Sequence, residues 1–144
     1  MDSSSNTTSF ATLTGTYPAT LIASGAGANT DTLIVTGASH ASIVLDMLFR
    51  NTDSSNARNY DIIICTTGSS GNALFNRVQI SIPANAGNNG TVGLACLASL
   101  APSLFDLDLA GNKVLTLESG VSIYVRNKAA LTADMIITTK LRSF

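Results

Sequence analysis

The chain has one histidine, His40, which follows Ser39 in the sequence GASHA (residues 37–41). A serine beside a histidine can act as a nucleophile with its base. A nucleophile elbow, however, needs a second glycine and a strand-to-helix turn, and neither is evident here. Zinc sites usually combine several His, Cys or carboxylate ligands, which one histidine does not supply. We therefore expect His40 in a loop or at a strand edge, with no catalytic or metal-binding role.

A second candidate is the sequence DLDLAG (residues 106–111), which is similar to the start of a calcium-binding loop. Ala110 stands where a third oxygen ligand would be needed, and no acidic residue follows at the required distance. The alternating leucines instead predict a strand with Asp106 and Asp108 on one solvent-facing side. We expect no metal site.

The stretch GAGANT (residues 25–30) resembles a dinucleotide-binding glycine loop only superficially, because no helix is predicted after it. The two cysteines, Cys65 and Cys96, lie in separate predicted strands without C-x-x-C spacing and continue apolar patterns. Buried free thiols are therefore expected, and a disulfide only if the two strands face each other. No cofactor and no catalytic residue is predicted.

Charge is sparse and balanced, with eight basic and nine acidic residues. The basic residues are scattered from Arg50 to Arg142 and form no stripe, so the electrostatic footprint of direct nucleic-acid binding is absent. Lys140 and Arg142, near the C-terminus, are candidates for salt bridges to a partner, although solvated surface charges are the more common case.

The rest of the polar surface comes from uncharged residues: 17 Ser, 17 Thr and 12 Asn, against 12% charged residues. Mean hydropathy is +0.30 and the net charge is −1, so little repulsion keeps copies apart. The longest aliphatic runs, such as Ile62–Ile64, are far shorter than the roughly 18 residues of a membrane-spanning helix. This composition favours either a small extracellular or engineered β-domain or, preferably, a protein that shares much of its surface with neighbours; no membrane partner is expected.

Residues 1–16 form a Ser/Thr-rich segment with little besides Phe10 and Leu13 to bury. Such a segment cannot offset its own ordering entropy, so we expect a flexible N-terminal arm that is disordered or ordered by a partner. The first residues lack the basic start and apolar stretch of a signal peptide, which predicts synthesis in a cytoplasm.

Residues 17–144 are expected to form one all-β domain. Alternating apolar residues predict short strands, with Ile43, Leu45, Met47 and Phe49 on one face of the second. Ile62–Cys65 is apolar on both faces, which predicts a central strand. Only residues 98–105, broken by Pro102, favour a helical turn. The predicted strands lie near residues 32–36, 42–50, 62–65, 77–82, 92–96, 107–109, 114–117, 121–125 and 135–141.

Glycine- and asparagine-rich turns separate these strands, and no helices connect them. Strands joined in this way pair in antiparallel fashion. The fold class is therefore predicted as an antiparallel two-sheet sandwich or a jelly-roll-like fold.

Three segments resemble small structural proteins of tailed bacteriophages: TYPATLIASGAGANTDTLIVTG (16–37), SIVLDMLFRNTDSSNARNYDIIICT (42–66) and FDLDLAGNKVLTLESGVSIYVRNKAALTADMIITT (105–139). The resemblance spans about residues 17–139 and includes an L-x-L-x-x-x-G-N-x-x-L-x-L-x-x-G pattern from Leu107 to Gly120. The segment CLASLAPSLF (96–105) departs from the pattern and leaves the exact type and its symmetry open.

The resemblance implies a capsid cement or decoration protein that binds between major capsid subunits and stabilises the phage head. It implies a location on the capsid exterior after synthesis in the host-cell cytoplasm, and self-association as a homotrimer or homodimer. Two alternatives stay open: a head-fibre or tail module, and a carbohydrate-binding sandwich on the virion surface. The second is disfavoured because the chain has no Trp and only three Tyr to serve as sugar platforms.

Interface residues are predicted from chain position and apolar character alone. Two come from the arm, one follows it, and two lie at the C-terminus, where an apolar end needs cover. They are Phe10, Leu13, Tyr17, Leu141 and Phe144.

Overall fold

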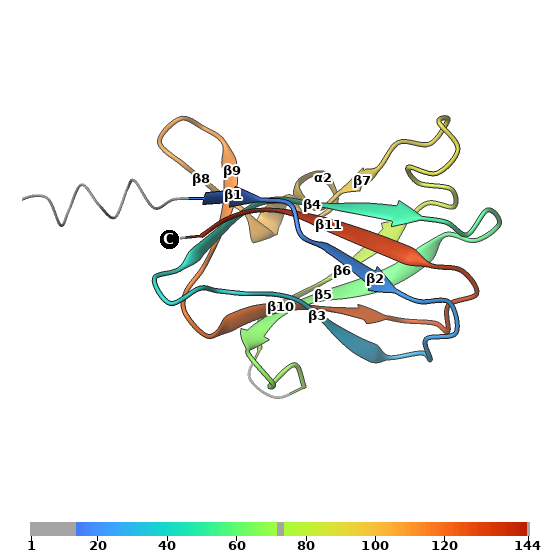
Figure 1. Cartoon of the computed structure of the whole chain (residues 1–144), viewed down its shortest axis with the longest axis horizontal. Coiled ribbons are helices and arrows are strands. Elements are labelled where there is room, and N and C mark those ends of the chain that lie inside the picture. The colour runs from blue at the N-terminus through green and yellow to red at the C-terminus, as the bar shows by residue number, and fades with distance from the viewer. Residues whose placement is uncertain (1–13, 72–73, 144) are drawn as a thin grey trace, which may run out of the picture.

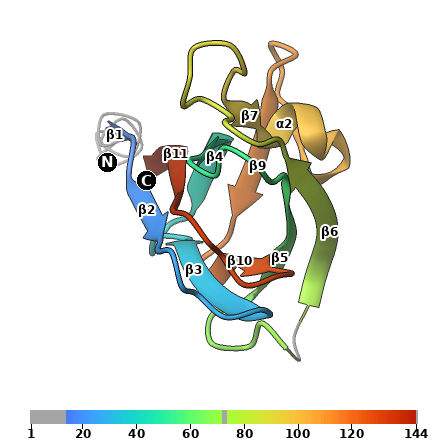
Figure 2. The same cartoon turned by 90° about the vertical axis from the view of Figure 1, so that its right-hand side faces the viewer.

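The computed structural model describes residues 14–71 and 74–143, and it is built almost entirely of strands. Figures 1 and 2 show two layers, with β4 and β11 in one and β3, β10 and β5 in the other. The elements are β1 (Thr14–Thr16), β2 (Ala19–Ile22), β3 (Thr30–Thr36), β4 (Ser42–Asn51), β5 (Arg58–Thr66), β6 (Leu74–Ile82), β7 (Ala95–Cys96), α2 (Leu97–Leu100), the 3-10 turn η1 (Pro102–Leu104), β8 (Asp106–Leu107), β9 (Lys113–Leu117), β10 (Val121–Asn127) and β11 (Met135–Ser143).

One sheet has seven strands, in the order β1-β11-β4-β9-β8, with β2 also paired to β11 and β7 also paired to β4. The other has four strands, in the order β3-β10-β5-β6. Every strand pair is antiparallel. The predicted all-β, antiparallel two-sheet sandwich is therefore confirmed.

The core lies between the inner faces of the two sheets. Alternate side chains of β5 enter it from the four-stranded sheet, and side chains of β4 and β11 meet them from the other sheet. Burial of each large apolar side chain contributes roughly 1.5–3 kcal/mol. The largest fully buried side chains include Tyr60, Phe49, Met47, Ile62, Ile82, Leu97, Leu117, Ile123 and Ile137.

Strand β5 lies between β10 and β6, and its apolar residues are buried on both faces, as predicted for a central strand. On the outer face, Asp61 pairs with Lys128 at 3.1 Å and with Arg77 at 3.5 Å. One strand further, Arg126 is paired with Asp31 through two hydrogen bonds. The charged side chains on the outer face of the four-stranded sheet thus form ion pairs with one another.

Strand β4 contains a β-bulge. Asp46 is opposite Lys140 and Val44 is opposite Leu141, so Leu45 has no partner on β11. An extra residue of this kind puts two successive side chains on nearly the same side of the strand. The structure accordingly buries Val44 and Met47 and leaves Leu45 and Asp46 half-buried on the outer face.

The bulge explains one wrong prediction. We expected Ile43 and Leu45 on the buried face with Met47 and Phe49, but alternation inverts at the bulge, and Ile43 and Leu45 face outward. A bulge adds a residue without interrupting the apolar pattern, so simple alternation does not reveal it.

The segment after residue 90 also differs from expectation. The strand predicted at 92–96 shrinks to β7, because residues 91–92 form a bend and the carbonyl of Val92 accepts a hydrogen bond from the Gly87 amide at 2.8 Å. The helical turn predicted at 98–105 is present as α2 and η1, divided at Pro102.

At the N-terminal end, Thr14–Thr16 belong to β1 and pair with Leu141–Ser143. These three residues were predicted to be the end of the arm. Residues 1–13 lie outside the described residues, so the division into an arm and a sandwich domain stays a prediction.

Asp53, in the loop after β4, connects the β4–β5 loop to the β10–β11 loop. Its carboxylate accepts hydrogen bonds from the Ser55 amide at 2.9 Å, from the Arg58 guanidinium at 2.6 Å and from the Thr132 hydroxyl at 3.0 Å. The Ser55 amide first, and then the Arg58 side chain, hold the pKa of Asp53 well below its ordinary value of 3.8.

We expect this carboxylate to make folding stability depend on acidic pH. Because the folded-state pKa is lowered, the stabilisation is present in full above about pH 4 to 5 and is lost as pH falls below the unfolded-state value. Asp53→Asn should therefore lower the thermal midpoint at pH 7 and flatten its pH dependence below pH 4. The exposed Glu118→Gln variant is the control, and equal pH profiles for wild type and Asp53→Asn would refute the assignment.

Candidate functional site

Two of the five predicted interface residues lie together in the structure. Tyr17 is 71% exposed, and Leu141 is half-buried and packs against the core. Both line a small hollow of about 90 Å³ between β1 and the outer face of β11, shared with Gly15, Thr16, Leu45, Lys140 and Arg142. Phe10, Leu13 and Phe144 lie outside the described residues.

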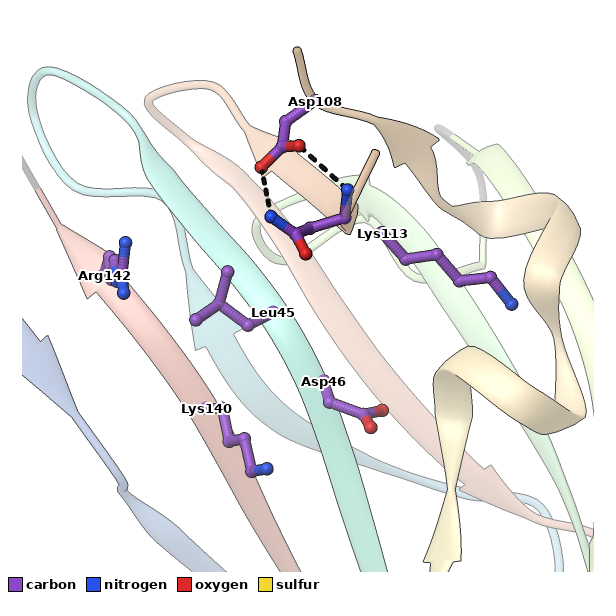
Figure 3. Close-up of a pocket in the computed structure, with 7 residues that line it drawn as sticks. Leu45, Asp46, Asp108, Lys113, Lys140 and Arg142 are labelled. Atoms are coloured by element: carbon purple, nitrogen blue, oxygen red, sulfur yellow. Dashed lines mark hydrogen bonds between the residues drawn. The ribbon is translucent and has the colours of Figure 1, made fainter. Parts of the chain in front are cut away.

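A larger hollow of about 500 Å³ adjoins it on the outer face of the seven-stranded sheet (Figure 3). The two hollows share Leu45, Lys140 and Arg142. Residues from three neighbouring strands and one turn contribute to the larger one, which therefore crosses much of the sheet. It is lined by Leu45 and Asp46 of β4, Lys140 and Arg142 of β11, Lys113 of β9, and Asp108 and Asn112 of the β8–β9 turn.

The bulge in β4 builds one side of this hollow. Because Leu45 has no partner on β11, it and Asp46 both face outward, next to Lys140. Lys140 and Arg142 are two residues apart on β11, so they point to the same face of the strand. Without the bulge, β4 would have one side chain fewer on the outer face beside Lys140.

Both carboxylates of the hollow are already engaged with backbone amides. Asp46 accepts from the amides of Met47 at 2.8 Å and Ala98 at 3.0 Å. Asp108 accepts from the amides of Ala110 and Asn112 at 2.9 and 2.8 Å. These bonds, led by the Asn112 amide, hold the pKa of Asp108 below its ordinary value. Both side chains therefore anchor the backbone around the hollow through Oδ1.

The cations of the hollow differ in their contacts. Lys113 donates to the carbonyl of Ala98 at 3.0 Å, and Asp46 accepts from the amide of the same residue. These two side chains therefore anchor helix α2 at Ala98. Lys140 and Arg142 form no ion pair with any residue in the described ranges. By contrast, Arg77, Arg126 and Lys128 on the four-stranded sheet are all paired. Unpaired positive charge is thus concentrated on the seven-stranded sheet.

Beside the hollow, the β8–β9 hairpin protrudes from the sheet, as Figures 1 and 2 both show. Leu107 is 70% exposed and Leu109 is fully exposed, and they flank Asp108 at the rim. Exposed leucines on a projecting hairpin leave apolar area in water that a partner would cover. The same face therefore combines a hollow, free cations and an apolar projection.

The residues first considered for chemistry are not brought together. Ser39 and His40 are exposed in the turn between β3 and β4, as expected for a loop histidine. Asp106 lies in β8, but Asp108 lies in the following turn, so the prediction of one shared strand face was wrong. The reason is that the Asp108 carboxylate bonds the turn's own amides.

The two cysteines are free and lie in different sheets. Cys65 is fully buried, as predicted, whereas Cys96 is only half-buried, because Leu97 rather than Cys96 takes the core position after β7. Burial raises the pKa of both thiols. In the described part of the chain, no three His, Cys, Asp or Glu side chains are grouped to hold a metal ion.

Among the described residues, no helix has the length and apolar character needed to cross a membrane. Sequence reasoning identified Lys140 and Arg142 as candidates for partner contacts, through their position near the C-terminus. It missed Leu45, Asp46 and Asn112, because the bulge and the turn geometry have no clear signal in the alternation of residues.

Comparison with known proteins gives little. The chain matches no family model and no curated protein. Among solved structures, it is similar to one described as "Cyanophage Pam1 capsid asymmetric unit", with 12% sequence identity and a TM-score of 0.45, over 92% of this chain and 86% of that chain. A likeness this distant leaves the function to be inferred from the chain's own residues.

Proposed function

We propose that this chain is a structural protein of a phage virion, and that it acts as a capsid cement or decoration protein. In this role it binds between major capsid subunits on the exterior of the shell and stabilises the head. One observation carries the proposal: the outer face of the seven-stranded sheet combines Lys140 and Arg142, which form no ion pair with the residues that the structure describes, with exposed Leu107, Leu109 and Tyr17. Such a mixed apolar and charged surface is suited to protein contact.

The engaged carboxylates of the hollow support a binding role over catalysis. A general acid or base needs a group that is free to exchange a proton with a substrate. In both Asp46 and Asp108, Oδ1 instead accepts hydrogen bonds from two backbone amides. We propose that the protein is not an enzyme.

The sandwich also fits the mechanical demands of a cement protein. Its antiparallel sheets, with a closed core and a neutralised outer layer of ion pairs, resist deformation when force is applied from the shell. Individually weak contacts repeated around a symmetric shell add up through avidity. The low net charge of −1 lets many copies approach one another.

The test is co-sedimentation of the purified protein with capsids from which it has been removed. We expect saturable binding with a fixed number of copies per particle, and reconstituted capsids that survive heating and osmotic shock better than bare ones. Protein that stays in the supernatant, or capsids whose resistance is unchanged by the bound protein, would contradict the proposal.

A further inference from the structure

We propose that the large hollow binds the β8–β9 hairpin of a second copy of this chain, so that two copies form a symmetric dimer in which each hairpin covers the other's hollow. The inference rests on the proposed function, because it assigns the large hollow and the hairpin of that interaction surface to a second copy and leaves exposed Tyr17 for contact with the capsid. Its test, however, requires no capsid, so the two proposals can fail separately.

The first argument is the position of the two features. The hairpin projects from the outer face of the seven-stranded sheet, and the hollow lies in the same face directly beside it. In a two-fold contact the same patch meets itself, so a projection next to a depression becomes self-complementary. One rotation brings each hairpin over the other's hollow.

The second argument is charge. The hairpin presents Asp106, which is exposed and forms no ion pair within the described ranges. The hollow presents Lys140 and Arg142, which are likewise unpaired there. Asp108 does not contribute to this charge pairing, because its carboxylate accepts hydrogen bonds from amides of the β8–β9 turn. Opposite charges at a partly buried contact fix the register of the two copies more than they add to affinity.

The third argument is apolar area. Leu107 and Leu109 on the hairpin are among the most exposed large apolar side chains of the described structure, and Leu45 lies in the hollow. Burying exposed leucines favours association, and the two-fold contact buries these leucines on both copies. An acidic sugar would match the cations but not these aliphatic side chains, which favours a protein occupant.

The experiment measures solution mass by light scattering over about a hundredfold range of concentration, at low salt so that the charges are little screened. The wild-type protein should approach twice 14.8 kDa. Two variants should remain monomers: Lys140→Glu with Arg142→Glu, which reverses the hollow, and Asp106→Lys, which reverses the hairpin. Circular dichroism checks that each variant is folded.

The decisive step is to mix these two variants in equal amounts. In the mixed pair, the reversed hairpin meets the reversed hollow, and the unchanged hairpin meets the unchanged hollow, so both halves of the interface are complementary again. We expect the mixture to regain the dimer mass. Arg50→Glu is the matched control, because Arg50 is a cation of β4 outside both hollows that bonds Asn88, and it should dimerise like wild type.

Three results would overturn the inference: a wild-type protein that stays monomeric throughout, charge-reversed variants that still dimerise, or a mixture that does not recover. If dimers form as described but do not bind capsids, the proposed function fails and the inference stands. If the wild-type protein stays monomeric but still binds capsids, the inference fails and the proposed function stands.

Discussion

Deleting Leu45 is expected to leave the sandwich folded, whereas deleting Leu48, three residues further along the same strand, should prevent folding. Leu45 is the extra residue of the bulge, so its removal leaves Val44 opposite Leu141 and Asp46 opposite Lys140, as before. The strand then alternates regularly, and Val44 and Met47 both still face the core.

Leu48 lies in a regular part of the ladder, opposite Thr138. Removing it makes Met47 and Phe49 neighbours, and one of these two fully buried side chains must then face outward. Loss of a large core side chain costs about 2–5 kcal/mol, a large fraction of the stability of a domain this size. The two deletions remove the same residue type from the same strand, so they differ only in the bulge.

Thermal unfolding followed by circular dichroism distinguishes the two variants. The Leu45 deletion should unfold cooperatively near the wild-type midpoint, and the Leu48 deletion should show no cooperative transition. The Leu45 deletion should also lower dimer affinity about tenfold, or about 1.4 kcal/mol, because the hollow loses one wall. Equal behaviour of the two deletions would refute the register assigned to β4.

Replacing Gly37 with alanine should destabilise the protein by about 3 kcal/mol, because the new methyl group has no room. A Cβ at this position would lie 2.1 Å from the carbonyl oxygen of Glu118 and 2.8 Å from that of Leu117. Both are backbone atoms at the end of β9, so relief requires moving the strand. Gly37 is further fixed by its amide, which donates to the carbonyl of Val121 at 2.8 Å.

Gly93→Ala is the control, since a Cβ there meets nothing within 4 Å. Its effect should stay within about 0.5 kcal/mol, as for most surface substitutions. Urea unfolding of both variants measures the difference. A Gly37→Ala protein as stable as the Gly93→Ala protein would mean that the β3–β4 connection does not approach β9 as closely as described.

The fold was largely predictable because its determinants are local and periodic. Strands such as β5 and β11 have alternating or continuous apolar residues, and glycine and asparagine occupy the turns between them. The short helical turn was predicted at residues 98–105, with its break at Pro102. The features that were not predicted are departures from periodicity. They are the bulge at Leu45 and the turn at Asp108, where the Asp108 carboxylate takes the place of a backbone carbonyl as the acceptor for the turn's amides.

The candidate site was predictable only in part, for the same reason. Tyr17 and Leu141 were predicted as interface residues from their place in the chain, and they line one small hollow together with Lys140 and Arg142. Leu45 and Asp46 reach that face only because the bulge turns them outward. The protrusion of the β8–β9 hairpin depends on the packing of whole sheets, which no local pattern specifies.

The most direct test of a structural role in the virion is electron microscopy of capsids with and without the protein. We predict added density of the size of this sandwich at every junction between major capsid subunits, absent from bare capsids and restored when the protein is added back. Identical maps of the shell, or added density confined to the tail or to fibres, would contradict the account.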